Sequence, residues 1–160
     1  MEIPKIILES NKNITLSIGI MYVNKIPFVT TISLHVKFTT IKAIQKRTKV
    51  KLSECIKNSM AIYTQRGFKV ENALLDGEFA PLRTDLINIC IAPNFTTRTE
   101  HVPEIERQHR VMKERAHTCR HTLTFEVLPW LLLVKMVNNC ALWLICSPRK
   151  EELPMSVRGI

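Results

Sequence analysis

Two short acidic segments contain the residues of this chain whose types and spacing suit chemistry. Asp76-Gly77-Glu78-Phe79 follows an apolar run typical of a buried strand, and Glu104-Ile105-Glu106 opens a basic run further along. An acid at a strand end and an acid in the first turn of a helix can offer oxygen ligands to one Mg²⁺ ion. Such ions assist phosphoryl transfer on polynucleotides. The pair therefore predicts a metal-assisted site with Asp76 and Glu106 as ligands.

A third acid is missing where such a site would take its first carboxylate. The middle of the first predicted strand reads Ile18-Gly19-Ile20, and glycine has no ligand atom. Two ions a few ångströms apart repel each other, and three carboxylates offset that repulsion while a phosphate bridges the ions. Two carboxylates would hold one ion weakly. The sequence thus indicates a nuclease-like frame with an impaired centre, and the candidates for a replacement ligand are Glu78, Glu104 and Glu9.

The composition fits one globular domain with an anionic partner. The chain has 160 residues, of which 46% are hydrophobic, and its formal net charge is +9. This charge favours nucleic acid as a partner, and the alternative is a basic protein with no such ligand. The cysteines are odd in number and form no C-x-x-C pair, which predicts reduced thiols inside a cell. We expect them to be small core residues and not nucleophiles. They are Cys55, Cys90, Cys119, Cys140 and Cys146.

Neither a signal peptide nor a membrane span is predicted. The first nine residues contain an early acid and a proline and only a short apolar run. The one candidate span, 127–146, contains Lys135 and the pair Asn138-Asn139, whereas a span needs about twenty mostly apolar residues. A buried or interface helix is the prediction there. We expect an intracellular protein of the nucleus or cytoplasm, with no membrane partner and no small-molecule substrate.

The elements that must position the acids follow from hydrophobic periodicity. Ile14, Leu16, Ile18 and Ile20 alternate with smaller or polar residues, as in a strand, and Asn24-Lys25 marks a turn. Further strands are predicted over 26–34, 36–39, 68–75 and 87–92, with a helical turn over 81–86. Helices are predicted over 41–66, 103–123 and 129–146. This order predicts an α/β fold with a mixed sheet flanked by helices.

The first predicted helix, 41–66, is basic in its first half. Its cations occupy a stretch that contains no acid, so this half can lie along a phosphate backbone. The alternative is a solvated helix face, and the sequence leaves both open. The cations are Lys42, Lys46, Arg47, Lys49 and Lys51.

The helix predicted over 103–123 combines a core-facing stripe with a charged flank. At 100° per residue the stripe comprises Ile105, Met112, Ala116, Cys119 and Leu123. Glu106 lies about a quarter-turn from the stripe. The cations on its side of the helix are Arg110, Lys113, His117 and Arg120. This flank can bind a metal at its N-terminal end and phosphates below, or Glu106 stabilises the helix dipole and the cations are merely solvated.

Several of these segments resemble integrase cores of retroelements. Asp76-Gly77-Glu78-Phe79 is similar to their Asp-Asn-Gly-x-Glu-Phe strand end, and the segment 104–110, Glu-Ile-Glu-Arg-Gln-His-Arg, is similar to their Val-Ala-Glu-Arg-x-Asn-Arg helix start. The likeness is to copia-type integrases, and it is closest to a divergent form in copia-like polyproteins of diatoms, through 20–28 and 100–107. It covers about 14–146, with an N-terminal extension, 1–13, and a C-terminal tail, 147–160.

The resemblance implies a ribonuclease H-like fold, a mixed five-stranded sheet flanked by helices. It also implies an Asp, Asp, Glu triad that binds two Mg²⁺ or Mn²⁺ ions for DNA strand transfer. By resemblance, Asp76 takes the second acid's place and Glu106 the third's, while the first acid's place falls at Gly19. The 29 residues between Asp76 and Glu106 are fewer than the family's interval of about 35, a difference that a trimmed loop can absorb. The residues assigned to nucleic-acid binding are Lys42, Lys46, Arg47, Arg107, Arg110, Lys113, His117 and Arg120.

Three interpretations compete. The preferred one is a degenerate integrase-core remnant that folds, binds DNA and is catalytically impaired. The second is a nuclease that uses two acids and a substitute ligand, and the third is a basic interaction module without catalysis. His117 and His121 can share a helix face, but without further ligands they predict no metal site. The helix 129–146 has more apolar surface than one sheet face needs, so it is either a homodimer interface, as the resemblance implies, or the buried last helix of a monomer.

Overall fold

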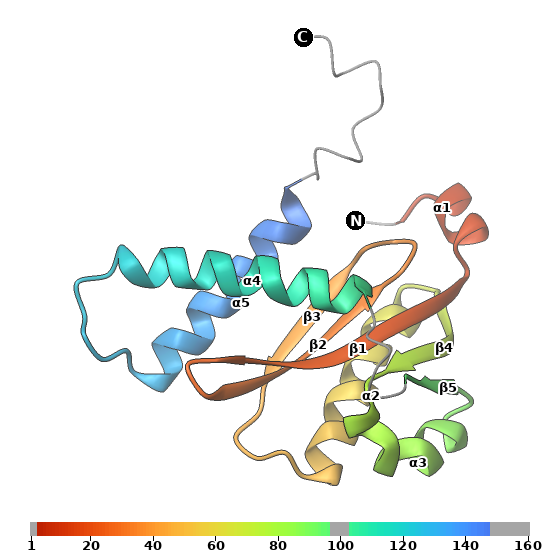
Figure 1. Ribbon diagram of the computed structural model, residues 1–160. Coiled ribbons are helices and arrows are strands. Elements are labelled where there is room, and N and C mark those ends of the chain that lie inside the picture. The colour runs from red at the N-terminus through yellow and green to blue at the C-terminus, as the bar shows by residue number, and fades with distance from the viewer. Residues whose placement is uncertain (1–2, 97–102, 148–160) are drawn as a thin grey trace, which may run out of the picture.

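A mixed sheet of five strands organises the computed structural model, which describes residues 3–96 and 103–147 (Figure 1). The spatial order of the strands is β3-β2-β1-β4-β5. Antiparallel pairing joins β1 to β2 and β2 to β3, and parallel pairing joins β1 to β4 and β4 to β5. The strands are β1 (Asn13–Val23), β2 (Ile26–Ser33), β3 (Thr39–Ala43), β4 (Lys69–Leu75) and β5 (Ala92–Phe95). The predicted mixed sheet is confirmed.

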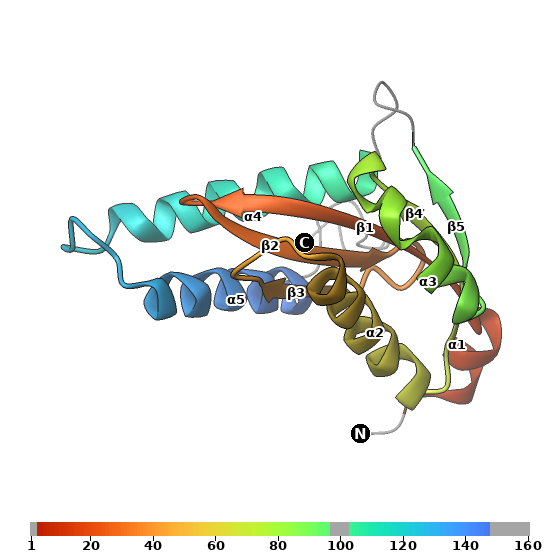
Figure 2. The ribbon, with the colours of Figure 1, turned by 90° about the horizontal axis from the view of Figure 1, so that it is seen from below.

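Helices cover both faces of this sheet. They are α1 (Lys5–Ser10), α2 (Lys49–Gln65), the 3₁₀ helix η1 (Gly77–Leu82), α3 (Arg83–Asn88), α4 (Pro103–His121) and α5 (Trp130–Cys146). Figure 1 shows α4 and α5 on one face and α2 on the other. In Figure 2, α4 lies along the β1–β2 hairpin and α5 lies against β3, in agreement with their contacts.

The alternation of β1 divides its side chains between two cores. Leu16 and Ile18 pack with α2 in the larger core, whereas Met21 packs with α4 and α5 in the smaller one. Ser17 and Gly19 lie on the same side of β1 as Met21, because alternate residues of a strand share a face. These two small residues allow α4 to approach β1 closely.

The basic segment 42–47 is not helical, so the prediction of one helix over 41–66 is wrong in its first part. β3 takes Thr39–Ala43 and pairs with β2, where Ile41 lies opposite Thr30. α2 begins only at Lys49, and the N-cap Thr48 accepts a hydrogen bond from the Lys51 backbone at 3.3 Å. The strand predicted over 36–39 forms a few residues later, as β3. The β-branched residues after Phe38 pair with β2 and complete this side of the sheet. The backbone hydrogen bonds between β3 and β2 thus outweigh the helical spacing of the residues that follow β3 in sequence.

The strand predicted over 87–92 is also wrong. α3 continues to Asn88, Cys90 adopts a φ of 60°, and the strand follows over Ala92–Phe95. Leu82 and Leu86 are buried at helical spacing, whereas Ile87 is exposed. Burial that repeats once per helical turn, and not at every second residue, is typical of a helix, so this segment forms α3 and not a strand.

Burial divides the cysteines. Cys55 and Cys140 are buried, as expected of core residues, but Cys90, Cys119 and Cys146 are exposed, so the core assignment is wrong for these three. The stripe on α4 is buried from Ile105 to Ala116 and ends before Cys119.

Some predictions concern segments at the ends of the chain. The expected N-terminal extension contains α1 in its described part. Of the expected tail, 147–160, only Ser147 is among the described residues. No helix in the described ranges, 3–96 and 103–147, combines the length and apolarity needed to cross a bilayer.

Candidate active site and nucleic-acid interface

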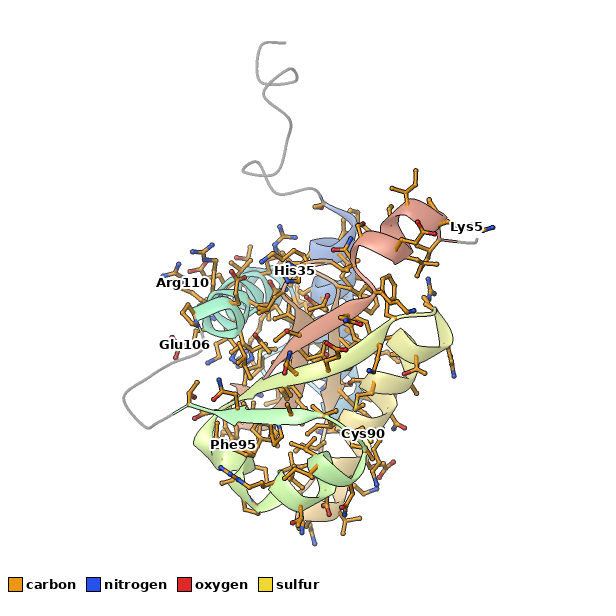
Figure 3. The ribbon with its side chains drawn as sticks, turned by 90° about the vertical axis from the view of Figure 1, so that its right-hand side faces the viewer. Lys5, His35, Cys90, Phe95, Glu106 and Arg110 are labelled. Atoms are coloured by element: carbon orange, nitrogen blue, oxygen red, sulfur yellow. The ribbon has the colours of Figure 1, made fainter. Side chains whose placement is uncertain are left out.

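The three positions that the sequence assigns to a metal site gather at one end of the sheet. Ile18 of β1 pairs with Leu75 of β4, so Gly19 and Asp76 follow side by side. α4 begins over the same place, because a Cβ built on Gly19 would lie 3.1 Å from Cγ1 of Ile105. Glu106, the next residue of α4, is exposed at the N-terminal end of the helix, on the side where β5 ends at Phe95 (Figure 3).

His109 fills the space beside Gly19. Its Cε1 atom would lie 2.9 Å from a Cβ at position 19, closer than real Cβ contacts come. The ring is held by a hydrogen bond between Nε2 and Oγ1 of Thr30, and this hydroxyl donates in turn to the Gly19 carbonyl at 3.1 Å. Since a hydroxyl has one proton, Thr30 accepts from His109, and the neutral ring carries its hydrogen on Nε2. An imidazole donor therefore occupies the place beside the sheet where a carboxylate is expected.

The surroundings of His109 keep its ring neutral. Burial lowers the pKa of His109 from 6.5 to about 4, and the nearby charge of Lys113 acts in the same direction. The ring is thus uncharged at neutral pH and adds neither a cation nor an anion to the site.

The low pKa of His109 predicts a stability that falls with acid. Between pH 6.5 and about 4 the unfolded chain binds the proton more readily than the folded chain. The stabilising contribution is therefore complete above pH 6.5 and is lost as the pH falls toward 4, by at most about 3 kcal/mol. Thermal denaturation at pH 7, 6, 5 and 4.5 should show a smaller loss for His109→Gln, which keeps a donor for Thr30. Parallel curves for the two proteins would contradict the assignment.

Asp76 is exposed and lies at the junction of β4 and η1. Its Oδ1 accepts a hydrogen bond from the Gly77 backbone at 2.7 Å, which caps η1. The carbonyl of the preceding Leu75 accepts from the backbone N of Thr96 at 2.9 Å and from its hydroxyl at 3.2 Å, so β5 ends beside the same junction. Phe79, fully buried, anchors the turn. The carboxylate is thus presented to solvent from a fixed backbone.

Of the three acids that could replace the missing carboxylate, two form ion pairs and the third lies far from Gly19. Glu78 pairs with Arg47 at 2.9 Å, and Glu104 pairs with Lys37 at 3.1 Å. Glu9 lies in α1, before β1, and the strand from Asn13 to Gly19 spans roughly 20 Å. In the described part of the chain, no group of three or more His, Cys, Asp or Glu side chains could hold a metal ion. These residues do not fit a two-ion site.

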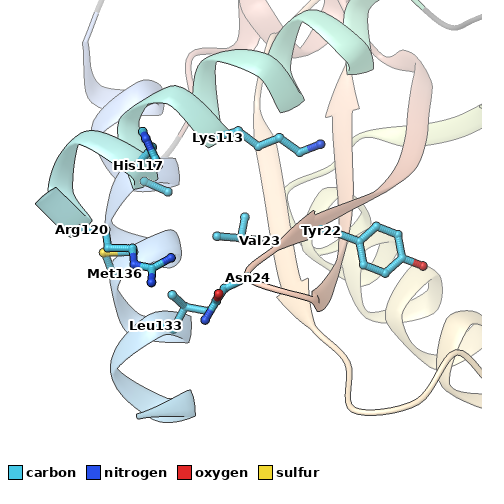
Figure 4. Close-up of a pocket in the computed structure, with 9 residues that line it drawn as sticks. Tyr22, Val23, Asn24, Lys113, His117, Arg120, Leu133 and Met136 are labelled. Atoms are coloured by element: carbon cyan, nitrogen blue, oxygen red, sulfur yellow. The ribbon is translucent and has the colours of Figure 1, made fainter. Parts of the chain in front are cut away.

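The basic residues of α4 form an exposed row along one side of the helix. The row comprises Arg107, Arg110, Lys113, His117 and Arg120. Its last three members border a cavity of about 180 Å³ between α4, α5 and the β1–β2 turn, and none of the lining residues is acidic. Figure 4 shows Lys113 and Arg120 of α4 around this cavity, together with Asn24 of the hairpin turn and Leu133 and Met136 of α5. His117 and His121 share a face as expected, with their Nε2 atoms 2.9 Å apart.

The basic residues before and within the start of α2 are partly neutralised. Lys42 pairs with Glu54 at 3.9 Å, and Arg47 pairs with Glu78 while donating to the Tyr22 hydroxyl at 2.7 Å. Glu54 and Glu78 come from later in the chain. The basic segment contains no acid in sequence, but in the folded protein these two acids lie beside it. Lys46 is exposed in the loop before α2.

Sequence reasoning missed His109 and Thr30. The only signal was the departure at position 109, where the helix start that this segment resembles has asparagine and this chain has histidine. The hydrogen bond joins residues 79 positions apart, and no periodicity in the sequence indicates it.

Comparison with known proteins supports the fold. No family model matches the chain, and no curated protein matches it. Among solved structures, the chain is similar to the catalytic core domain of BIV integrase in crystal form I, with a TM-score of 0.63 and 14% sequence identity. The match covers 89% of this chain and 87% of that chain. The chain therefore has the ribonuclease H-like α/β fold of an integrase catalytic core.

Proposed function

We propose that this chain is a degenerate integrase catalytic core that binds nucleic acid and has lost efficient strand transfer. The observation that carries this proposal is the replacement of the first acid by Gly19, with the His109 ring packed in the space beside it. The resemblance of its sequence segments supports a copia-type retrotransposon polyprotein of the diatom-like form as the source of this core.

The remaining acids would support only a weak cation site. Asp76 and Glu106 are exposed at the end of the sheet and could together hold one Mg²⁺ or Mn²⁺ ion. The second ion needs further negative charge to offset the repulsion between the cations. Because Glu78 and Glu104 are paired with cations, a two-acid nuclease with a substitute ligand is the less favoured alternative.

Nucleic acid is the partner that the charge distribution favours. The row on α4 places cations at successive turns of one helix, starting beside Glu106, so phosphates bound along it would lead to the candidate site. The cavity at the far end of the row has no acidic lining residue that would repel a phosphate. Lys42, Lys46 and Arg47 lie near α2 and make a secondary, partly neutralised group.

Removal of two cations from the row should weaken DNA binding and its dependence on salt. For Lys113→Ala with Arg120→Ala, the slope of log affinity against log salt should fall by about 2, because each phosphate contact contributes about 1. Fluorescence anisotropy of a labelled duplex over a KCl series measures this slope.

Arg115→Ala is the matched control, since Arg115 is exposed on the same helix but lies on the opposite side from Lys113. Because the control removes one charge and the test variant removes two, a loss half as large in the control would assign the effect to net charge alone. If the wild-type chain does not bind DNA, the proposal fails and the non-catalytic interaction module becomes the better account.

A homodimer is the second proposal, and the apolar surface of α5 supports it. Leu131, Leu142 and Trp143 are 60%, 58% and 67% exposed, which is costly for a helix that faces water. A second copy of the chain would cover these side chains through a symmetric contact. Sedimentation equilibrium should show a dimer for the wild type and a monomer for Trp143→Glu, and a wild-type monomer at high concentration would exclude this arrangement.

A further inference from the structure

Two thiols on neighbouring helices lie in direct contact. The Sγ atoms of Cys119 on α4 and Cys140 on α5 are 4.0 Å apart, although 21 positions separate them in sequence. A disulfide has a sulfur-to-sulfur bond of about 2.0 Å, so the two sulfurs must approach by about 2 Å. The two helices already pack against each other, and the remaining approach requires rotation of the two side chains.

The two thiols differ in access to solvent. Cys119 is exposed near the C-terminal end of α4, whereas Cys140 is buried in the middle of α5. Burial, and then the proximity of Cys119, raise the pKa of Cys140 to about 11, so Cys140 remains a protonated thiol shielded from reagents in solution. An oxidant would therefore meet Cys119 first.

The other cysteines lack this arrangement. Cys90 and Cys146 are exposed, and within the described residues neither has a sulfur at hydrogen-bonding distance. Cys55 is buried in the other core, on the α2 side of the sheet. Among the described residues, only the pair on α4 and α5 combines an exposed sulfur with a buried sulfur in contact.

We propose that Cys119 and Cys140 form a site of reversible thiol oxidation that links α4 to α5. Hydrogen peroxide takes two electrons from the Cys119 sulfur, which gains a hydroxyl group to become a sulfenic acid, and the other peroxide oxygen leaves as water. Because the Cys140 thiol is protonated, its proton passes to the Cys119 hydroxyl group as the Cys140 sulfur attacks the Cys119 sulfur. The hydroxyl leaves with that proton as a second water, and the disulfide forms. A dithiol reductant returns both thiols.

Such a link would fix the helix that carries the candidate site to the helix that carries the apolar surface. α4 positions Glu106, His109 and the cation row, and α5 presents Leu131, Leu142 and Trp143. The link would close the loop between positions 119 and 140, which restricts the unfolded chain and so stabilises the folded one. This inference does not depend on DNA binding.

Mild peroxide treatment of the full folded chain tests the proposal. Peptide mass spectrometry without reduction should find one cross-linked pair that contains residues 119 and 140, with the loss of two hydrogen atoms. The melting temperature should rise by about 5 °C or more, and dithiothreitol should reverse both changes.

Cysteine-to-serine variants distinguish oxidation at this pair from unselective oxidation of the other cysteines. Cys119→Ser should abolish the link and the rise in melting temperature, whereas Cys90→Ser and Cys146→Ser should keep both. Because Cys119 is exposed, its variant is expected to fold even if Cys140→Ser does not. Oxidation of Cys119 to a sulfinic acid without a cross-link, or a cross-link to a different cysteine, would overturn the proposal.

Discussion

Gly19→Asp is expected to destabilise the fold by about 2 kcal/mol, and removal of the His109 ring is expected to cancel much of this loss. The added Cβ would meet His109 Cε1 at 2.9 Å and Ile105 Cγ1 at 3.1 Å, so both side chains must move. The hydrogen bond to Thr30 resists the movement of the ring. Gly19→Asp restores a ligand atom at position 19, but the His109 ring packed beside this position opposes the substitution.

A double-mutant cycle with His109→Ala measures this opposition. Urea denaturation of the wild type, the two single variants and the double variant should give a coupling energy of about 1 to 2 kcal/mol. Gly19→Asn is the control for size, since it has the shape of aspartate without its charge. Additive losses in the cycle would show that His109 does not fill the space beside Gly19 in solution.

The double variant Gly19→Asp, His109→Ala should gain metal-dependent DNA cleavage. It places a third carboxylate next to Asp76 across the β1–β4 pair and clears the ring from the space that this carboxylate needs. Three carboxylates offset the repulsion between two divalent ions, which two do not. With Mn²⁺ and a labelled duplex, we expect cleavage at least about a hundredfold above the wild type.

Two controls make the gain specific to the site. His109→Ala alone should remain at the wild-type level, because it adds no ligand. Asp76→Asn in the double variant should remove the gain. Equal cleavage by the wild type and the double variant would contradict the account, as would a gain that survives the loss of Asp76.

Much of the fold could be predicted, because the residue patterns that indicate its strands and helices lie within short segments of the sequence. The alternation over 14–20 and the turn at Asn24-Lys25 define the β1–β2 hairpin, and the apolar stripe from Ile105 to Ala116 defines the buried face of α4. The positions of Asp76 at a strand end and Glu106 in a first helical turn followed from the same patterns. Resemblance then supplied the fold, which the structural comparison supports.

The rest could not be predicted because it depends on contacts between distant residues. β3 forms where the sequence pattern predicts a helix, because it pairs with β2 through a ladder of backbone hydrogen bonds. Lys42 lies 3.9 Å from Glu54 on α2, an ion pair that the acid-free stretch of sequence does not indicate. A glycine in a strand likewise gives no sign of the His109 ring that packs on it, 90 positions later.

Calorimetric titration with Mn²⁺ measures how weakly the wild-type site binds a divalent ion. We expect no saturable binding by the wild type tighter than about 1 mM, and clearly tighter binding by the Gly19→Asp, His109→Ala variant. Micromolar binding by the wild type that Asp76→Asn abolishes would contradict this expectation, because the site would then be intact with a ligand other than residue 19.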